Sequence, residues 1–359
     1  MGVVKILLGR GEVNPRKPDD AGRTPAAYAV QGGHKEVIKI LLTCEGADPD
    51  RPETWGTAPL WNAAVGGHEE AAKILLGRHE VDLDKLDYEG MTLLSRAASN
   101  GHEEVVKILL KCEGVNPGKP DNNGRTPLSQ AAERGHEGVL KILLDCEEVN
   151  PRKPDDDGRT PLWWAACNGH EGVVKILLER DNVNSDMQNT NGQTLLWWAA
   201  YRGREGVVKI LLGRDNVDPD KPDNTGRAPL SQAAERGHEG VLKILLGCEE
   251  VNPDRPDNDG KTPLLYAAWR GHEGVVKILL RQEEVEPDRP DNWGHTPLLW
   301  AARHGHEGVV KVLLGRAEVN PNKPTNLGHT PLMYATMGGH TKVIALLQPR
   351  DEVVIPSAS

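Results

Sequence analysis

Apolar residues recur along the chain in two kinds of short run that alternate. One run reads Val-Val-Lys-Ile-Leu-Leu, as at residues 173–178, and its spacing gives a helix a wide apolar face. The other begins Thr-Pro-Leu and carries two adjacent alanines, as at residues 160–166. We therefore expect pairs of short helices, the first of them about eight residues long and the second with the wide apolar face.

Capping residues mark the ends of the first helix of each pair. Thr160 is a good N-cap, and Pro161 stands in the first turn, where a missing N–H costs nothing. Gly169 supplies the left-handed residue that ends the helix. Neither helix would persist alone in water, and the small Ala165 and Ala166 allow neighbouring helices to approach closely. Stability must therefore come from the packing of successive pairs.

The helix pair repeats without slippage. The first glycine of each copy recurs every 34 residues, at Gly22, Gly56, Gly90, Gly124, Gly158, Gly192, Gly226, Gly260, Gly294 and Gly328. Ten copies in register predict a linear stack, which no single-core size limit constrains. The absence of Phe fits thin layers filled by Leu, Ile, Val and Ala.

This unit resembles the ankyrin repeat, over roughly residues 1–348. The resemblance implies an all-α fold, an ankyrin-repeat solenoid of helix-turn-helix units with extended or hairpin-like loops. The period of 34 is one residue longer than usual, and other residues follow Thr-Pro-Leu where the family has His. Repeats two and seven lose the capping Thr, at Ala58 and Ala228, and Arg204 replaces the histidine of Gly-His in repeat six.

We expect one array with atypical ends. Residues 3–8 read as a second helix without the first helix of its pair, so the array is expected to begin inside a longer protein or to be truncated. We expect a single solenoid over residues 1–348. It consists of an N-terminal half-repeat (1–18), nine full repeats (19–324) and a C-terminal capping repeat (325–348), and a flexible tail (349–359) follows it.

Charge and cysteine usage narrow the class of protein. The net charge is −10 and no run of five like charges occurs, which argues against a nucleic-acid partner. No signal peptide or membrane-spanning run is visible in the sequence. Four of the five cysteines share one repeat position, about 8–10 Å from their equivalents and too far for disulfides. These observations predict a cytoplasmic monomer with free thiols that binds no membrane.

The motifs of catalysis and cofactor binding are absent from the sequence. There is no phosphate-binding loop of the Walker type and no G-x-S-x-G. One histidine per repeat cannot converge on one metal ion, so we interpret these histidines as structural, and His304 with His306 leaves only adventitious metal binding as an alternative. The acidic residues of the connecting loops are interpreted as a solvated edge. We expect no enzyme activity, no metal and no cofactor.

Some repeat positions vary while the framework does not. When the first glycine of each unit is numbered 4, variation concentrates at positions 2, 3 and 5, in the loop tip, and 9, 10, 13 and 14, in the first helix. All nine Trp and all five Tyr fall at positions 2, 3, 9, 10 or 13, and basic residues recur at positions 5 and 14. In ankyrin-like proteins these positions line the concave groove where partners bind, and Trp, Tyr and Arg dominate interface hot spots.

We therefore predict a partner-binding surface with its hot spot at two pairs of adjacent tryptophans, Trp163-Trp164 and Trp197-Trp198. The alternative is that these rings are half-buried packing residues that cover the alanines. Against it, position 10 also holds Asn62, Arg96 and Gln130, which we do not expect at a buried position. The predicted contact residues are Tyr28, Trp55, Trp61, Arg125, Arg159, Trp163, Trp164, Trp197, Trp198, Tyr201, Arg202, Tyr266, Trp269, Arg270, Trp293, Trp300 and Tyr334.

The predicted function is recognition of a protein or peptide. Residues 125–151 and 227–253 differ at only two places, which indicates recent duplication. Near-identical repeats with diversified surface positions resemble the arrays of fungal NACHT-type (NLR-like) receptors, in which the array senses a target. A stand-alone scaffold or adaptor for an endogenous partner is the main alternative. A carbohydrate-binding surface is a third, because exposed Trp also stacks on sugar rings.

Overall fold

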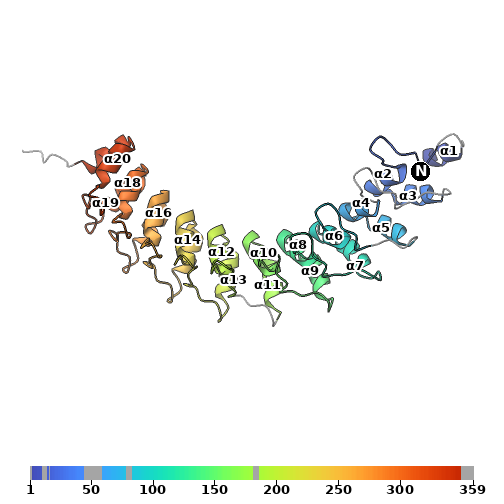
Figure 1. The fold of residues 1–359 in the computed structure, drawn as a ribbon, viewed down its shortest axis with the longest axis horizontal. Coiled ribbons are helices and arrows are strands. Elements are labelled where there is room, and N and C mark those ends of the chain that lie inside the picture. Colours follow the sequence, from blue (N-terminus) through green and yellow to red (C-terminus); the bar gives the residue numbers. More distant parts are fainter. Residues whose placement is uncertain are drawn as a thin grey trace, which may run out of the picture. The chain divides into compact units, whose positions relative to one another are not determined.

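The computed structural model of the chain describes residues 2–9, 14–15, 17–43, 59–77, 83–180 and 186–348. Within these ranges the chain contains 21 helices and no strands. The chain divides into two compact units, Met1–Val183 and Asn184–Ser359. Each unit repeats the expected helix pair with the expected 34-residue period, so the predicted all-α fold class is confirmed (Figure 1).

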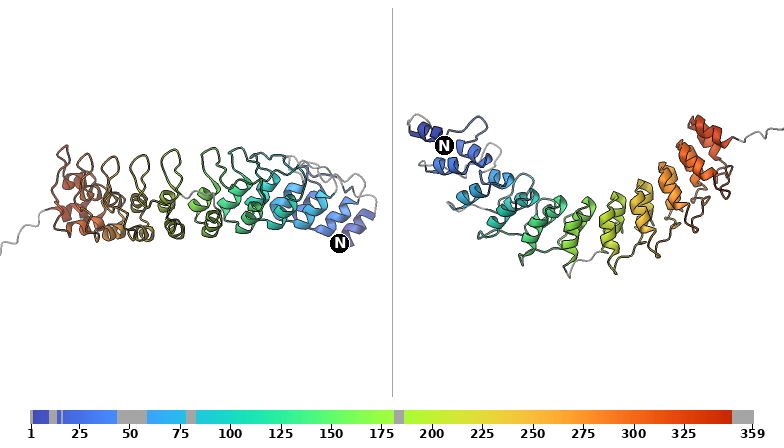
Figure 2. Two further views of the ribbon diagram at one scale, coloured as in Figure 1. Left: turned by 90° about the horizontal axis from the view of Figure 1, so that it is seen from below. Right: turned by 180° about the vertical axis from the view of Figure 1, so that it is seen from behind.

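In the first unit the helices form two rows. The second helices of the pairs are α1 (Gly2–Gly9), α3 (Lys35–Leu42), α5 (Glu69–Leu76), α7 (Glu103–Leu109), α9 (Glu137–Leu144) and α11 (Glu171–Leu178). The first helices are α2 (Pro25–Gln31), α4 (Pro59–Gly66), α6 (Leu93–Ser99), α8 (Pro127–Arg134) and α10 (Pro161–Asn168). Within this unit, neighbouring first helices pack on one another, and each first helix packs on the second helix of its own pair (Figure 2).

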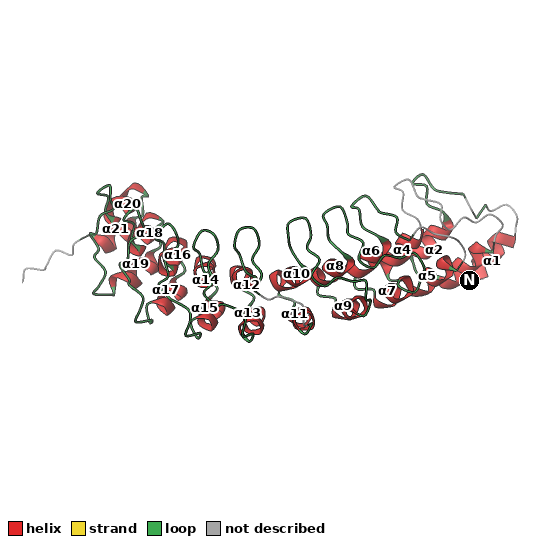
Figure 3. Ribbon diagram, turned by 60° about the horizontal axis from the view of Figure 1, so that its bottom comes forward, coloured by secondary structure: helices red, strands yellow, loops and turns green. Residues whose placement is uncertain are grey.

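The second unit has the same arrangement. Its first helices are α12 (Leu195–Arg202), α14 (Pro229–Arg236), α16 (Pro263–Arg270), α18 (Pro297–Arg303) and α20 (Pro331–Met337). Its second helices are α13 (Glu205–Leu212), α15 (Glu239–Leu245), α17 (Glu273–Leu279), α19 (Glu307–Leu314) and α21 (Thr341–Leu347). Loops connect each second helix to the next first helix and lie beside one another within the unit (Figure 3).

The capping residues act as the sequence predicts. The hydroxyl of Thr160 accepts a hydrogen bond from the backbone N–H of Trp163 at 3.3 Å, and Gly169 has a φ of 84°. Ala228 makes no side-chain cap, as expected, whereas Ala58 lies outside the described residues. The paired alanines 165 and 166 are fully buried, so adjacent first helices meet closely.

The recurring histidine is a structural link between repeats. In α11's repeat, Nε2 of His170 lies 2.8 Å from the backbone oxygen of Glu133 in α8. A carbonyl oxygen only accepts, so this nitrogen carries the hydrogen. A Cβ on Gly135 would lie 2.5 Å from the same ring, so both this contact and the φ of 80° require glycine there. The same link joins repeats through His68, His102, His136, His238, His272, His306 and His340.

Some acidic residues of the connecting loops are buried, contrary to the expectation that these residues form a solvated edge. Asp254 is 4% exposed, and its Oδ2 lies 2.9 Å from Nη1 of Arg289 in the next repeat. Asp220 makes the same 2.9 Å pair with Arg255. Burial raises the pKa of Asp254 and of Asp220, despite the guanidinium beside each. These carboxylates are therefore packed parts of the joints between repeats, because each pairs with the residue 35 positions later.

Cysteines at the shared repeat position carry free thiols in the described residues, as the sequence predicts. They are Cys112, Cys146 and Cys248, and burial raises the pKa of each. Cys44 and the tail at 349–359 lie outside the described residues. No helix in the described part of the chain is long and apolar enough to cross a membrane.

Candidate functional site

In most of the described repeats, the loop that precedes the first helix is organised by one aspartate at position 1. In repeat five, Oδ1 of Asp155 accepts hydrogen bonds from the backbone N–H groups of Asp157 at 3.1 Å and Arg159 at 2.7 Å. Its other oxygen, Oδ2, accepts from the indole N–H of Trp164 at 3.1 Å. The carboxylate thus closes the loop and ties it to position 10 of the helix.

Several side chains at position 10 share this bond although their sizes differ. In six of the described repeats, the side chain at this position carries a donor that reaches Oδ2 of the aspartate nine residues earlier. The donors are Tyr28 (2.8 Å), Arg96 (2.6 Å), Gln130 (3.0 Å), Trp164 (3.1 Å), Tyr266 (2.5 Å) and Trp300 (3.4 Å). Variation at position 10 is therefore compatible with a structural role.

This finding overturns the expectation that a buried position would not tolerate polar residues. Gln130 is only 6% exposed, and Gln232 is 1% exposed. The amide of Gln130 is buried without penalty because it donates to the loop carboxylate of Asp121. Comparison of the repeats shows that the residue at this position varies. It does not show whether the different side chains make the same structural hydrogen bond or contact different partners.

The first tryptophan pair lies in α10 and is split between surface and core. Trp163 is half-buried, whereas Trp164 is 9% exposed, and their rings meet edge to face with centroids 5.0 Å apart. The guanidinium of Arg159 lies 4.9 Å from the ring of Trp163, and that of Arg125 lies 4.2 Å from the ring of Trp164. Only Trp163 offers a substantial ring surface here.

The second pair, in α12, is split in the opposite sense. Trp197 is 3% exposed and donates its indole N–H to the backbone oxygen of Arg227 at 3.1 Å, whereas Trp198 is half-buried. The ring of Tyr201 stacks on Trp197 with a centroid distance of 5.5 Å. The prediction of exposed pairs is thus corrected for the buried rings at 164 and 197, because the hydrogen bond of each points into the array.

The other predicted aromatic contact residues of the first unit lie in repeats other than that of Trp163 and Trp164. Tyr28 is 46% exposed, with the guanidinium of Arg23 at 4.7 Å from its ring. Trp61 is half-buried in α4, and Trp55 lies outside the described residues. Tyr88, which was not among the predicted contact residues, is 82% exposed in a loop tip.

Aromatic rings in the second unit form a continuous track over three repeats. We define the aromatic track as Tyr266, Trp269, Trp300, His304 and Tyr334. Trp269 lies 6.2 Å from Tyr266 and 5.1 Å from Trp300, measured between ring centroids, and Trp300 stacks on His304 at 5.8 Å. The guanidinium of Arg303 lies between Tyr334 and Trp300, 5.2 Å from the centroid of each ring. Tyr266 is 4% exposed, whereas Trp269, Trp300 and Tyr334 are half-buried.

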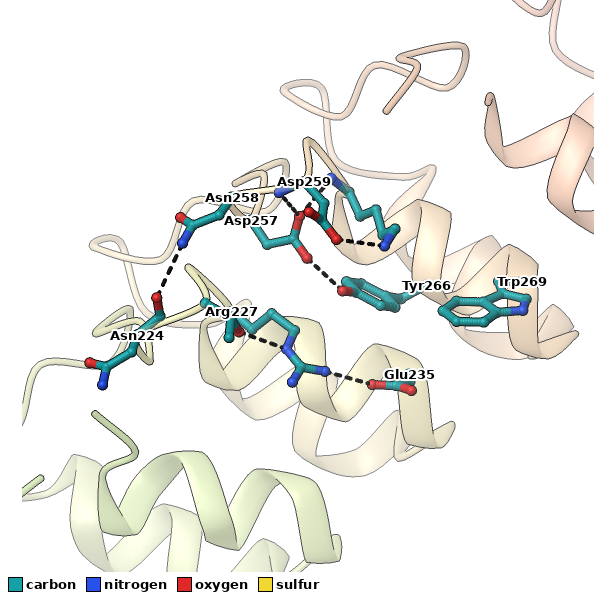
Figure 4. Close-up of a pocket in the computed structure, with 10 residues that line it drawn as sticks. Asn224, Arg227, Glu235, Asp257, Asn258, Asp259, Tyr266 and Trp269 are labelled. Atoms are coloured by element: carbon teal, nitrogen blue, oxygen red, sulfur yellow. Dashed lines mark hydrogen bonds and ion pairs between the residues drawn. The ribbon is translucent and has the colours of Figure 1, made fainter. Parts of the chain in front are cut away.

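A pocket of about 440 Å³ adjoins this track (Figure 4). The ring of Tyr266 lies beside that of Trp269, and its hydroxyl donates to Asp257 at 2.5 Å. Burial, and then the bond to Asp257, raises the pKa of Tyr266 far above its ordinary value. The lining residues are Asn224, Thr225, Arg227, Glu235, Asp257, Asn258, Asp259, Lys261, Tyr266 and Trp269. The lining is polar, with one aromatic side.

The basic residues at position 5 are largely neutralised within their own repeats. Carboxylates lie near their cationic groups in the pairs Arg23–Asp19 (3.1 Å), Arg125–Glu133 (2.8 Å), Arg159–Asp157 (2.8 Å), Arg227–Glu235 (3.5 Å) and Lys261–Asp259 (2.9 Å). The amine of Lys261 also lies 5.2 Å from the ring centroid of Trp293, which is 47% exposed. The predicted basic ladder at this position is therefore a ladder of ion pairs.

Arginines at the ends of the first helices are the more exposed cations. Arg202, Arg236 and Arg270 are the last residues of α12, α14 and α16, and all three are exposed. Arg303 ends α18 and is exposed as well. The sequence predicted Arg202 and Arg270 as contact residues but not Arg236 or Arg303. Their place at the ends of first helices was the available signal.

Metal-ligating side chains do not gather into a cluster in the described part of the chain. No group of three or more His, Cys, Asp or Glu side chains in that part of the chain could hold a metal ion. The rings of His304 and His306 lie 6.0 Å apart and nearly parallel. His306 is already bound to the carbonyl of Trp269, which fits the structural role expected for that histidine.

Comparisons with known proteins bear directly on the repeat. The family model described as ankyrin repeats in three copies matches seven overlapping segments, at residues 42–121, 76–154, 94–187, 137–223, 180–257, 216–291 and 283–355. The model of a single ankyrin repeat matches residues 21–53. No curated protein matched the chain. Because the matched segments span far more than half of its length, the chain belongs to the ankyrin-repeat family, whose repeats form protein–protein interaction modules.

Proposed function

We propose that this protein binds a peptide or protein partner in the concave aromatic and basic groove expected along its first helices and loop tips, with the aromatic track as the centre of contact. One observation carries the proposal. The ring centroids of Trp269 and Trp300, which belong to adjacent repeats, lie 5.1 Å apart. Both side chains are only half-buried, so part of each ring is still in contact with water. A partner that covers them removes further ring surface from water, which is a large source of binding energy.

The composition around the track supports the same conclusion. Arg270 lies over Trp269 and Arg303 over Trp300, with guanidinium-to-centroid distances of 4.8 and 5.2 Å. Trp, Tyr and Arg are the residues that most often dominate interface energetics. The adjoining pocket supplies amide, hydroxyl and carboxylate groups that can orient a bound chain.

The two tryptophans of each adjacent pair are proposed to have different roles, one in partner contact and one in supporting the surface. Trp163 and Trp198 are proposed as contact residues, with Tyr28, Trp61, Tyr201 and other half-buried or exposed aromatic residues of the same positions. Trp164 and Trp197 instead support the surface from beneath, since each donates its indole N–H inside the array. Substituting all four at once would therefore mix loss of contact with loss of stability.

The broader role is proposed from the repeats themselves. Residues 125–151 and 227–253 are nearly identical, whereas the outward positions of the repeats differ, which suits an array that diversifies by duplication. We propose that the array is the recognition part of a larger fungal NLR-like protein, acting as a cytoplasmic, non-enzymatic monomer. A stand-alone scaffold for an endogenous partner uses the same surface and differs only in what the array is joined to.

The test compares three forms of the full chain for capture of partners from a lysate of the source cells. The first is unchanged, and the second carries Trp269→Ala and Trp300→Ala. The third carries Ile278→Ala and Val312→Ala, which remove half-buried apolar side chains from the second helices of the same two repeats. A captured protein is then purified, and its Kd for each form is measured by calorimetry in the presence and absence of soluble glycans.

We expect the double tryptophan variant to bind at least tenfold more weakly, which corresponds to about 1.4 kcal/mol. The control variant should bind like the unchanged chain, provided that circular dichroism shows equal helicity for all three. Equal binding by all three forms would place recognition elsewhere and refute the proposal. Competition by glycans alone would assign the surface to carbohydrate instead.

A further inference from the structure

Four consecutive first helices of the second unit end in an arginine. Arg202, Arg236, Arg270 and Arg303 are the last residues of α12, α14, α16 and α18, and all four side chains are exposed. We call these four residues the arginine row. Within the first unit, only α8 among the described first helices ends this way. A positive charge at a helix C-terminus is mildly stabilising by itself, but that effect does not require an aromatic neighbour.

Aromatic rings lie beneath the guanidinium groups of the row. The guanidinium of Arg236 lies 4.1 Å from the ring centroid of Tyr201 and also hydrogen-bonds its hydroxyl. That of Arg303 lies 5.2 Å from the centroids of both Trp300 and Tyr334. Stacking uses the face of a guanidinium and leaves N–H groups on its edge available for hydrogen bonds. The row therefore presents oriented donors.

The carboxylates that neutralise arginines elsewhere are missing along most of the row. In the first unit, Arg125 and Arg159 each stack on a tryptophan and each have a carboxylate at 2.8 Å. Among the residues that the structure describes, no carboxylate lies within ion-pair distance of Arg202, Arg236 or Arg303. Within the row, Arg270 alone has such a partner, the 9% exposed Glu235 at 2.6 Å. Three cationic edges thus lack an internal counterion, although the chain as a whole has a net charge of −10.

We propose that the arginine row binds the side-chain carboxylates of an extended acidic peptide, with one acidic residue at every third position. This inference rests on the proposed function and specifies the chemistry of the ligand. Helices that pack side by side have axes about 8–10 Å apart. A chain in the extended polyproline conformation advances about 3.1 Å per residue, so three residues span about 9 Å, close to one repeat of the array. The three-residue turn of this helix points every third side chain the same way.

A single-stranded nucleic acid is the other polyanion that could meet arginines stacked on rings. The surface next to the row argues against it, because Asp259 has a half-exposed carboxylate on the loop tip and Glu235 lies between two arginines. Closely spaced phosphates could not avoid these carboxylates, whereas a peptide with acidic residues only at intervals can. A nucleic acid is therefore kept as an outcome of the test.

The probe is a fluorescein-labelled peptide with four glutamates, each three residues after the last, in a background of alanine and proline. Two further peptides serve as comparisons: one with glutamine in place of glutamate, and one with the same four glutamates in a single block. Binding to the full chain is measured by fluorescence anisotropy. The protein variants are Arg236→Gln and Arg303→Gln, with Arg316→Gln as the control, since Arg316 follows α19 and pairs only loosely with Glu318 at 3.8 Å.

The spaced peptide should bind at least fivefold more tightly than the block peptide, and the glutamine peptide should show no binding. Each row variant should weaken the spaced peptide about five- to tenfold, the loss expected for one charge-assisted contact. Arg316→Gln should change nothing, and added salt should weaken binding throughout. The row arginines are exposed, so circular dichroism should show unchanged helicity.

Equal binding of the glutamate and glutamine peptides, or row variants that bind like the unchanged chain, would overturn the inference. So would a thymidine oligonucleotide that binds more tightly than the spaced peptide and is lost in the row variants. The proposed function has its own readout. One outcome is that a captured partner fails to bind the variant with Trp269→Ala and Trp300→Ala but binds normally to Arg236→Gln and Arg303→Gln. In that case the proposed function stands, and the proposal of an acidic ligand is wrong. If no substitution affects that partner, both are wrong.

Discussion

The indole N–H of Trp164 donates a hydrogen bond to Oδ2 of Asp155, 3.1 Å away, and so ties α10 to the loop before it. The other oxygen of Asp155 holds the loop by accepting from the backbone N–H groups of Asp157 and Arg159. One buried carboxylate therefore fixes both the loop tip and a ring of the first helix. The same construction at Tyr266 and Asp257 shows that the repeat does not depend on which aromatic donor is used.

Asp155→Ala should destabilise the fifth repeat by about 2–3 kcal/mol, because it leaves three donors without their acceptor, at least one of them buried. The loss should be local, since repeat arrays transmit stability mainly through nearest neighbours. Hydrogen exchange would detect it as reduced protection of amides in α10 and α11, measured by mass spectrometry on the full chain.

Asp155→Asn is the matched control, because repeat six carries Asn189 at the same position. Oδ1 of Asn189 accepts from the N–H groups of Asn191 and Gln193 at 3.0 Å each, so an amide can close this loop. We expect the asparagine variant to lose less protection than the alanine variant. Equal loss in both variants would mean that the acceptor for the indole N–H, and not the loop closure, carries most of the stability.

Ala228→Thr should stabilise the second unit by about 1 kcal/mol. Repeats four and seven are nearly identical, and Thr126 caps α8 by accepting from the N–H of Ser129 at 3.2 Å, while Ala228 gives α14 no such bond. The two residues have almost the same backbone angles, with φ of −84° and −80° and ψ of 165° in both. A threonine therefore fits without a change in the backbone. Thermal unfolding followed by circular dichroism would measure the gain.

The reverse substitution, Thr126→Ala, gives a direct comparison in the other unit. It should lower stability by about the amount that Ala228→Thr raises it, because the cap is the same. If the midpoint of unfolding falls on Ala228→Thr, the 1% exposed site at residue 228 is too crowded for a second methyl group and a hydroxyl.

His272→Ala should destabilise the joint between repeats seven and eight by about 1–2 kcal/mol. Nε2 of His272 lies 3.0 Å from the backbone oxygen of Glu235, and removal of the ring leaves that carbonyl without this donor. His34→Ala is the control, because no hydrogen bond of the His34 ring occurs within the described residues. Urea unfolding of both variants, with helicity as the signal, would separate them. A similar loss in both would show that the histidine acts by packing and not through the bond.

The fold could be predicted from the sequence because each of its devices obeys a local rule. Thr160 caps a helix and Gly169 ends one through preferences of their own backbones and side chains, and a fixed period reveals their repetition. The sequence also predicts that the recurring histidine is structural, although its partner, a carbonyl of the preceding repeat such as that of Glu133, follows only from the packed helices.

The candidate site was only partly predictable, because exposure depends on neighbours that lie a repeat away. Trp163 and Trp197 occupy the same repeat position, yet only Trp197 is buried, since the backbone oxygen of Arg227 in the next repeat accepts its indole N–H. In the same way, the charge of Arg270 is offset by Glu235 from the preceding repeat. No single repeat contains such information.

Tyr266 should make the second unit sensitive to alkaline pH. Burial, reinforced by the hydrogen bond to Asp257, raises the pKa of Tyr266 in the folded protein well above the value of about 10 in an unfolded chain. A folded pKa above the unfolded one contributes stability that is complete below about pH 10 and is lost as the pH rises further, because only the unfolded state then releases the proton.

Tyr266→Phe tests this linkage, because phenylalanine cannot ionise. Below pH 10 the variant should be less stable by about 1 kcal/mol, since Asp257 loses a donor. Above pH 10 the gap should close, because stability of the unchanged chain falls more steeply with pH. Urea unfolding at a series of alkaline pH values measures both slopes, and ultraviolet difference spectra count the tyrosines that ionise before unfolding. Parallel slopes would show that the phenol of Tyr266 ionises as readily in the folded state as in the unfolded state.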